Sequence, residues 1–407
     1  MKILHLISQH PAQTGSGFYV QNMIQQCLAH GHKSHLVAGI SGDEFSELSC
    51  LPATDCTFIS FNRDELNFII PGMSDVMPYP SSRFSTLSEQ HLDSYSNTFR
   101  KTVTKVAEEF SPDVIHSHHL WLASIAARTA CPDIPMVCSC HSTDLRQYLH
   151  HEHLRHRISA ITQLDRILAL SQTQRDQIID VHGINNEKID IVGGGYDTKR
   201  FIGREKMSAP PVQFVYAGKL SSAKGVPSLL QAIERLSDPR IHLHLVGSGS
   251  SEEGEYCLQL AQYLPNSVTI HGAITQEKLA DLMGKCHVFV LPSFFEGLPL
   301  VLLEALSSGC RIICSDLPGC KELLERGGPD IVDFVELPKM IGVDQPDPSD
   351  IDTFTSDIAR ALAKMTDRVI DKPSPSASDI KELTRSYSWD AVFSRVEEIY
   401  KEVTGSA

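Results

Sequence analysis

The amino-acid sequence predicts an α/β protein with two doubly wound domains that face each other across a cleft. Three features carry this prediction. Short β-branched runs alternate with helix-like stretches, this pattern restarts near the middle of the chain, and a polar segment ending in two prolines precedes the restart. Such alternation is typical of a parallel sheet covered on both faces. A chain of 407 residues is also long enough for two ordinary domains.

Ten short apolar runs are the expected strands. In the first half they lie at residues 3–7, 35–38, 113–116, 136–140 and 167–170. In the second half they lie at residues 213–216, 242–246, 267–270, 287–291 and 311–314. Between the first two runs we expect an amphipathic helix from about residue 18 to residue 30, with Gly31 just after its end.

The polar segment 203–211 suits a linker between the two domains. We therefore place a first Rossmann-like domain at residues 1–204 and a second at residues 205–388.

Composition and charge narrow the class of protein. Hydrophobic residues make up 42% and charged residues 21%, as in a soluble globular protein. The net charge of −14 argues against a nucleic-acid partner and weakens electrostatic docking on an anionic membrane. The eleven cysteines form no Cys-x-x-Cys pair, and the first apolar run is too short for a signal peptide. We therefore expect a cytoplasmic protein.

A loop and a helix after the expected strand 287–291 give the sharpest signal for a binding site. Gly297 lets the backbone turn, and Pro299 fits the first turn of a helix, where a missing N–H costs nothing. The helix expected from there is apolar nearly all round, and Glu304 is its only charge. The free N–H groups at its start suit a diphosphate. Glu304 could accept hydrogen bonds from a ribose, and Glu296 could hold sugar hydroxyls.

The alternative interpretation of the two acids needs no ligand. Glu304 could pair with a core arginine or lysine, and Glu296 could be a solvated loop acid.

Two lysines five residues apart follow the first strand of the second domain. Lys219 and Lys224 flank a short loop, and Gly218 keeps the end of the strand open. Cleavage of a nucleotide sugar leaves additional negative charge on the diphosphate, which two ammonium groups would stabilise most strongly in the transition state. Two unrelated surface lysines could show the same spacing.

Three further strand ends carry candidate contacts. Gly15 and Gly17 form a glycine-rich turn, Gly247 lies in another, and His141 follows the strand 136–140. Backbone amides in such turns can approach phosphate or sugar. The third glycine of a dinucleotide fingerprint is replaced by Val20, which argues against NAD. His141 could instead merely cap the next helix.

We expect no metal site. The stretches 116–119 and 150–153 are rich in histidine, a residue that often binds metals. A zinc site, however, needs three or four converging side chains, and the spacing of these histidines alone does not supply them. The one Asp-x-Asp, at residues 350–352, suits a helix cap.

Taken together in their order along the chain, these glycine turns, lysines, glutamates and the histidine resemble the motifs of the retaining glycosyltransferases of family 4. These enzymes have the GT-B fold of two Rossmann-like domains. The resemblance extends over nearly the whole chain. It includes residues 111–118, similar to the family's PDVIHxH strand, residues 191–201, similar to IPNGVDxxRF, and residues 387–393, similar to FSWxxV. The family's PNG is Val192, Gly193 and Gly194 here, so we expect a different loop geometry near the hinge.

The resemblance implies a role for each matched residue. Glu296 would contact donor-sugar hydroxyls, Glu304 the ribose, and Lys219 and Lys224 the diphosphate, although the first of these lysines is more often arginine in the family. His141 would approach the transferred sugar. We take Glu296, His141, Lys219 and Lys224 as the candidate catalytic residues.

Backbone contacts are implied as well. Gly297, Leu298 and Pro299 match the loop that meets the sugar, and Leu300 and Val301 match the turn that faces the phosphates. Gly15 and Gly17 match a mobile loop of the first domain. The resemblance further implies that the last helix, about residues 389–407, crosses back to pack on the first domain.

The implied activity is retaining transfer of a sugar from a nucleotide-diphosphate sugar, with UDP favoured over GDP, to a hydroxyl acceptor in glycan or glycoconjugate biosynthesis. It needs no metal, no cofactor and no dedicated protein base. Asp144 and Arg146 are candidate acceptor contacts on the first domain. The alternatives are another GT-B enzyme, such as a nucleotide-sugar epimerase, and a non-catalytic nucleotide-sugar-binding protein.

Overall fold

Two parallel β-sheets organise the structure, one for each half of the chain. The first sheet has seven strands in the order β3-β2-β1-β4-β5-β6-β7, and the second has six in the order β10-β9-β8-β11-β12-β13. In each, the first strand lies inside the sheet and the chain winds first toward one edge and then toward the other. Ligands of such sheets bind beside the carboxyl ends of the strands where the winding reverses. Those points are β1 beside β4, and β8 beside β11.

The strands are short and mostly buried, because helices cover both faces of a parallel sheet. The first sheet consists of β1 (Lys2–Ile7), β2 (Lys33–Ser41), β3 (Cys56–Phe61), β4 (Val114–His118), β5 (Met136–Ser139), β6 (Arg166–Ala169) and β7 (Ile189–Ile191). The second consists of β8 (Val212–Ala217), β9 (Ile241–Val246), β10 (Val268–Gly272), β11 (Val288–Leu291), β12 (Arg311–Ser315) and β13 (Val332–Val335).

Helices connect the strands in both halves. With the first sheet belong α1 (Gly15–Ala29), α2 (Glu89–Phe110), α3 (Leu122–Ala130), α4 (Thr143–His150), α5 (Gln172–His182) and α14 (Trp389–Thr404). With the second belong α6 (Val226–Leu236), α7 (Glu252–Gln262), α8 (Gln276–Lys285), α9 (Val301–Ser307), α10 (Pro318–Leu324), α11 (Gly328–Ile331), α12 (Ile351–Asp371) and α13 (Ala377–Thr384). Short 3-10 helices are η1 (Ala53–Asp55), η2 (Phe84–Thr86), η3 (Glu152–Gln163), η4 (Asn186–Lys188), η5 (Ser222–Lys224), η6 (Glu325–Gly327) and η7 (Arg385–Tyr387).

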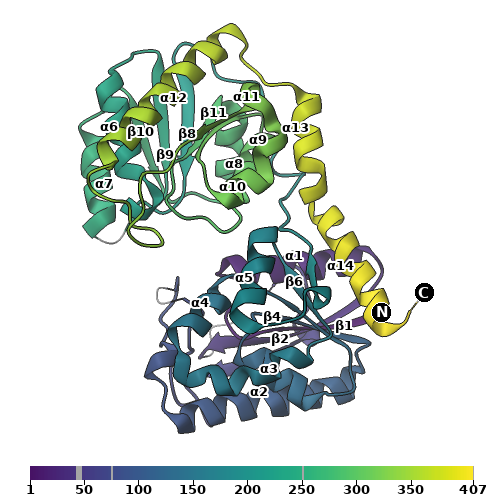
Figure 1. Ribbon diagram of the computed structural model, residues 1–407. Helices are drawn as coiled ribbons and strands as arrows, with labels where there is room; N and C mark the ends of the chain where they lie inside the picture. The colour runs from purple at the N-terminus through teal and green to yellow at the C-terminus, as the bar shows by residue number, and fades with distance from the viewer. Residues whose placement is uncertain (43–47, 75–76, 250–251, 407) are drawn as a thin grey trace. The chain divides into compact units, whose positions relative to one another are not determined.

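The computed structural model describes residues 1–42, 48–74, 77–249 and 252–406, and its contacts divide the chain into two units (Figure 1). The first unit is Met1–Gly195 with Trp389–Ala407, and the second is Tyr196–Ser388. Tyr196 and Phe201 are buried in the core of the second unit. The segment 196–204, which we expected in the first domain, therefore packs with the second.

The strands of the first unit alternate their side chains between two cores. Ile3 of β1 packs in a cluster with Met23 of α1 and Phe393 of α14. Its neighbour Leu4 packs in a different cluster, with Val103 of α2. Because successive side chains of a strand point to opposite faces, α1 and α14 cover one face of the sheet and α2 covers the other. This return of the last helix to the first unit is as predicted.

The predicted fold class is confirmed: both sheets are parallel and doubly wound, and each of the ten expected strands is present. The prediction missed three strands: β3, β7 and β13. Each of them lies at the edge of its sheet. An edge strand has a partner on one side only and tolerates polar residues, so its sequence carries a weaker apolar signal.

Two further findings concern the cysteines and the apolar character of the helices. All eleven cysteines lie in the described residues, and none of them forms a disulfide. Across the described part of the chain, no helix has the length and apolar character that crossing a membrane requires.

Candidate functional site

In the second unit, the loop after β8 is fixed by the ends of the neighbouring strands. The amide of Gly218 donates to the carbonyl oxygen of Val246 at the end of β9, at 3.1 Å. The Tyr216 hydroxyl donates to the carbonyl oxygen of Lys219 at 2.8 Å. These bonds hold the loop at the carboxyl edge of the sheet, where ligands of doubly wound sheets bind.

Two glycines allow this packing. Gly225 has φ +66°, and a Cβ built on it would overlap the carbonyl oxygen of Pro292 just after β11. Gly247 has φ +146°, and its Cβ would overlap the carbonyl oxygen of Gly218. Both backbones need glycine for two reasons, the left-handed conformation and the lack of room for a side chain. The loops after β8, β9 and β11 are therefore in backbone contact.

Lys224 and Glu296, which are 72 residues apart in sequence, meet between two of these loops. Their Nζ and Oε1 atoms lie 2.7 Å apart, and the hydroxyl of the buried Ser293 also donates to Oε1, at 2.7 Å. The amide of Phe294 donates to the carbonyl oxygen of Ala223, which ties the two loops together beside the ion pair. The side chains of Lys224 and Glu296 are 31% and 16% exposed, so a ligand can reach both.

Lys219 differs from Lys224. Its side chain is exposed, and within the described residues its ammonium group forms no ion pair or hydrogen bond. The two predicted phosphate ligands are thus one paired lysine and one solvated lysine.

The loop leading into α9 presents backbone donors. Leu300 is the N-cap of α9, and no side chain caps the helix start. Among the described residues, the amides of Gly297, Leu298 and Val301 donate to no protein acceptor. Pro299 has no N–H to satisfy. The predicted helix from Leu300 is seven residues long in the structure, so what it offers an anion is free backbone amides and not the dipole of a long helix.

Glu304 is half-buried on α9, and its carboxylate has no hydrogen-bond or ion-pair partner among the described residues. Burial raises its pKa to about 7, against the opposing charge of Arg200. Arg200 itself lies 3.6 Å from Glu277 and 3.7 Å from Asp197. The alternative in which Glu304 forms a direct pair with a core arginine or lysine is therefore wrong, and the carboxylate is left available for a ligand.

In the first unit, Gly15 and Gly17 lie in the first turn of α1 and not in a separate loop. Thr14 is the N-cap, and its hydroxyl accepts the amide of Gly17 at 3.0 Å. A threonine cap of this kind starts a helix, so α1 begins three residues before the expected Phe18. The side-chain amide of Gln9 donates to the same hydroxyl at 2.9 Å.

His141 lies two residues beyond the end of β5. Its Nε2 is 3.1 Å from Nδ1 of His118, and its ring is nearly perpendicular to that of Tyr19, with the ring centroids 5.1 Å apart. Burial lowers the pKa of His141 to about 3, so the ring is neutral at pH 7. The alternative that this histidine only caps a helix is not what the structure shows, since Ser142 is the N-cap of α4.

Asp144 and Arg146 have different environments. Asp144 is fully buried, and its oxygens accept the amides of Leu120 at 2.7 Å and His141 at 3.2 Å. Its role is structural, because it holds the ends of β4 and β5 together, and it does not offer a free carboxylate to an acceptor. Arg146 is exposed.

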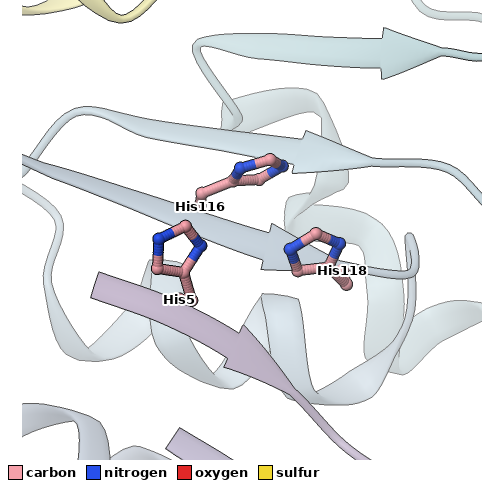
Figure 2. A group of neighbouring side chains, drawn as sticks. All are labelled: His5, His116 and His118. Carbon is pink, nitrogen blue, oxygen red and sulfur yellow. The ribbon is translucent and has the colours of Figure 1, made fainter. Parts of the chain in front are cut away.

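Three buried histidines form the one cluster with metal-ligand geometry in the described residues. One nitrogen from each of His5, His116 and His118 lies within 4.8 Å of the others, and Figure 2 shows the three rings gathered over β1 and β4. Both nitrogens of His116 already bond, to the hydroxyls of Tyr400 at 2.6 Å and Ser139 at 2.8 Å. A metal would have to displace one of them, and the cluster supplies no anionic ligand to offset the charge of a buried ion.

The prediction from sequence missed several functional neighbours. Ser293 and Gly225, which shape the Lys224–Glu296 pair, lie next to predicted site residues in sequence and could have been found there. His118 was considered only as part of a histidine-rich stretch. Its contact with His141 depends on the pairing of β4 with β5, where His118 lies opposite Ser139.

The second unit also has a cavity of about 420 Å³, which lies apart from the candidate site. Its lining includes Phe201, Lys206, Gly309 and Thr384, at the carboxyl-terminal end of α9. The candidate site lies at the other end of that helix.

Comparisons with known proteins give matches to both halves of the chain. The model of "Glycosyltransferase Family 4" matches residues 14–200, and that of "Glycosyl transferases group 1" matches residues 197–333. A glycogen synthase of Mycobacterium tuberculosis is 25% identical over 53% of this chain and 55% of its own length. The putative teichuronic acid biosynthesis glycosyltransferase TuaC of Bacillus subtilis is 28% identical over 55% of this chain and 58% of its own. The aligned region thus spans little more than half the length of these curated relatives.

Solved structures match over the whole chain. Sucrose-phosphate synthase of Thermosynechococcus elongatus has a TM-score of 0.71 at 18% identity, with 100% of both chains covered. HepE of Anabaena in complex with UDP has a TM-score of 0.66 at 16% identity, with 99% of this chain and 100% of that chain covered. At this identity the likeness establishes the fold.

Replacement of Gly225 by alanine should distort the candidate site. The left-handed φ alone costs an L residue about 1–2 kcal/mol, and here the new Cβ also overlaps the carbonyl oxygen of Pro292. We expect Gly225→Ala to lose at least ~2 kcal/mol more unfolding free energy than Gly272→Ala, as measured by denaturant unfolding. Gly272 is a matched control because it also has φ +66° but has no atom within 4 Å of the added Cβ. Equal losses in the two variants would contradict the close contact.

The buried histidines should make the first unit sensitive to acid. Burial lowers the pKa of His5 to about 3 and the pKa values of His116, His118 and His119 well below 6.5. The unfolded chain therefore binds more protons below pH 6.5, so this stability is fully present above 6.5 and is lost as the pH falls. Each histidine contributes a slope of up to ~1.4 kcal/mol per pH unit.

Both tryptophans, Trp121 and Trp389, lie in the first unit, so urea unfolding followed by their fluorescence measures this dependence. We expect a loss of several kcal/mol between pH 7 and pH 5. His150→Asn, a change at an exposed histidine, should leave the slope unchanged. A stability that stays constant over this range would show that the buried rings take up protons as readily in the folded state as in the unfolded chain.

Proposed function

The chain belongs to the family 4 glycosyltransferases, which have the GT-B fold, and from this premise we propose that it transfers a sugar from a nucleotide-diphosphate sugar to a hydroxyl acceptor. In this proposal the second unit binds the donor and the first unit binds the acceptor. Transfer retains the anomeric configuration and needs no metal ion.

The observation that carries the proposal is the arrangement around the Lys224–Glu296 pair. A lysine and a glutamate meet at 2.7 Å beside the free amides of Gly297 and Leu298. Glu304 lies further along the same segment, half-buried and without a partner among the residues that the structure describes. A nucleotide-diphosphate sugar has a matching order of groups: sugar hydroxyls, two phosphates and a ribose.

Each group of the donor then has a partner of suitable chemistry. Glu296 accepts hydrogen bonds from sugar hydroxyls, and Lys224, together with the solvated Lys219 and the free amides, binds the diphosphate. Glu304 accepts the ribose hydroxyls, which bond best to an ionised carboxylate and so oppose the effect of burial on its pKa. Donor binding would replace the Lys224–Glu296 contact with contacts of each residue to the donor, so that Lys224 pairs with a phosphate and Glu296 stays hydrogen-bonded through sugar hydroxyls.

The chemical step follows from the same charges. The bond between the anomeric carbon and the diphosphate oxygen breaks, and the acceptor oxygen bonds to that carbon on the same face. The acceptor proton passes to the departing diphosphate oxygen, so no protein base is required. Negative charge grows on the diphosphate as the bond breaks, and Lys224 and Lys219 stabilise it more in the transition state than in the ground state.

The comparisons support a UDP-sugar as donor. HepE, which shares the fold, has been solved with UDP and with UDP-glucose. The relatives named above include a glycogen synthase and an enzyme of teichuronic acid biosynthesis. We therefore propose a UDP-sugar as the donor and a saccharide or glycoconjugate as the acceptor.

Removal of the Lys224 ammonium group should slow transfer. We expect Lys224→Ala to lower kcat by ~10²-fold or more, the usual loss for one transition-state donor, as measured by nucleotide release with saturating donor. Lys278→Ala, which removes an exposed lysine on α8, is the matched control and should keep the wild-type rate. Wild-type kcat in Lys224→Ala would rule out the phosphate role.

A panel of UDP-, GDP- and ADP-sugars tests the donor class by thermal shift. A donor present at ~100 times its Kd should stabilise the protein by ~2.7 kcal/mol, and we expect this for UDP-sugars. The best donor should then support transfer in excess EDTA, with the product's anomeric configuration, read by NMR, equal to that of the donor. Stabilisation without any turnover would favour a non-catalytic binding protein, and epimerised donor would favour an epimerase.

A further inference from the structure

We propose that His118 is a positioning residue for His141: its Nδ1–H donates to Nε2 of His141, so that His141 presents Nδ1–H as a hydrogen-bond donor to a substrate oxygen. This inference rests on the proposed function for the identity of the substrate, and on the geometry of the first unit for everything else.

The two rings are in direct contact at the carboxyl edge of the first sheet. His118 is the last residue of β4, and His141 follows β5, the strand paired with it. Nδ1 of His118 and Nε2 of His141 lie 3.1 Å apart, and the rings are nearly parallel, with centroids 5.4 Å apart. A hydrogen bond between two imidazoles at this distance fixes the orientation of both rings.

The ring of His118 is also packed against other aromatic rings, which restrict its reorientation toward His141. Its ring stacks on that of His116, with centroids 4.4 Å apart. His116 is in turn fixed at both nitrogens, by Tyr400 of α14 and by Ser139 of β5. The Tyr19 ring makes a T-shaped contact with that of His118, with the ring centroids 5.9 Å apart. The position of His141 is therefore set by a stack of rings that reaches from the last helix to the end of the sheet.

Counting protons identifies the donor. Burial lowers the pKa of both rings far below neutrality, so each carries one proton, on Nδ1 or on Nε2. Nε2 of His118 is buried and has no partner in the described part of the chain. An unpaired buried N–H is less tolerable than an unpaired acceptor, so the proton of His118 belongs on Nδ1. Nε2 of His141 then accepts, and the proton of His141 must be on Nδ1.

This assignment limits what His141 can do. Its Nδ1 forms no hydrogen bond with a described residue, and the ring is half-buried rather than enclosed. With Nε2 engaged and Nδ1 protonated, the ring has no free lone pair and cannot act as a base. It can donate one hydrogen bond to a substrate hydroxyl or ring oxygen, in agreement with a transfer that uses no protein base.

The direct test is the tautomer of His141, read from imidazole nitrogen shifts by ¹H–¹⁵N NMR of the whole protein. We expect Nδ1–H in the wild type. In His118→Phe, which keeps a ring in the stack but removes the donor, we expect a shift toward Nε2–H. His118→Asn places an amide N–H near the position of Nδ1 and should restore the wild-type tautomer. An Nε2–H form in the wild type, or an unchanged tautomer in His118→Phe, would overturn the proposal.

His119 provides the matched control. Its ring is also buried and lies 4.9 Å from that of His141, but neither of its nitrogens bonds to another described residue. His119→Phe should therefore leave the His141 tautomer unchanged. A tautomer shift in this variant as large as in His118→Phe would mean that general burial, not the His118 bond, sets the proton position.

Kinetics gives a second measurement. His118→Phe should lower kcat by about tenfold or more, as expected when a donor to the reacting molecule is lost or misaligned, whereas His118→Asn should recover most of the rate. Binding of UDP to the second unit, followed by thermal shift, should be equal in all variants. If the wild type shows no transfer, the proposed function fails while the tautomer result stands. If transfer occurs but His118→Phe keeps the wild-type kcat, the positioning role fails alone.

Discussion

The second unit depends on one contact, the ion pair between Lys224 and Glu296. An ion pair with partly exposed partners adds little to stability, so its importance is positional. It joins the loop after β8 to the loop after β11, next to a hydrogen bond between their backbones and a serine that shares the carboxylate. In the function proposed above, two of the charged groups that bind the donor are therefore in place before it arrives, and each compensates the other until then. A site prepared in this way needs little rearrangement when it exchanges one ionic partner for another.

The two units use opposite electrostatic strategies. In the second unit, the functional groups are charged and partly hydrated, as with Lys219, Lys224 and Glu296. In the first, the stacked histidines His116 and His118 are buried and neutral and bond to hydroxyls and to other rings, and among the described residues Asp144 is the one buried carboxylate, which accepts hydrogen bonds from backbone amides. Charge suits the binding of phosphate. Neutral donors suit the orientation of a sugar hydroxyl, because they bind it without attracting ions or protonating the leaving group.

Much of the fold could be predicted from the sequence, because the interior strands of a parallel sheet are continuous apolar runs. The edge strands β3, β7 and β13 could not, since their residues meet only one neighbour. Individual residue types also indicated Lys224, Glu296 and Glu304 as site candidates, but not the direct pairing of the first two, which depends on the close backbone approach at Gly225. The His118–His141 contact could not be predicted from the sequence either, because it depends on the register in which β4 pairs with β5. The helix α1 starts before the expected residue, because the Thr14 hydroxyl caps it.

The return of α14 to the first unit bears on the order in which the protein is made. Domains generally fold as units during synthesis, beginning with the amino-terminal one. Here the second unit, residues 196–388, is synthesised before the residues of α14. The contacts of α14 with the first sheet, including the bond between Tyr400 and His116, can therefore form only after the whole second unit has been synthesised.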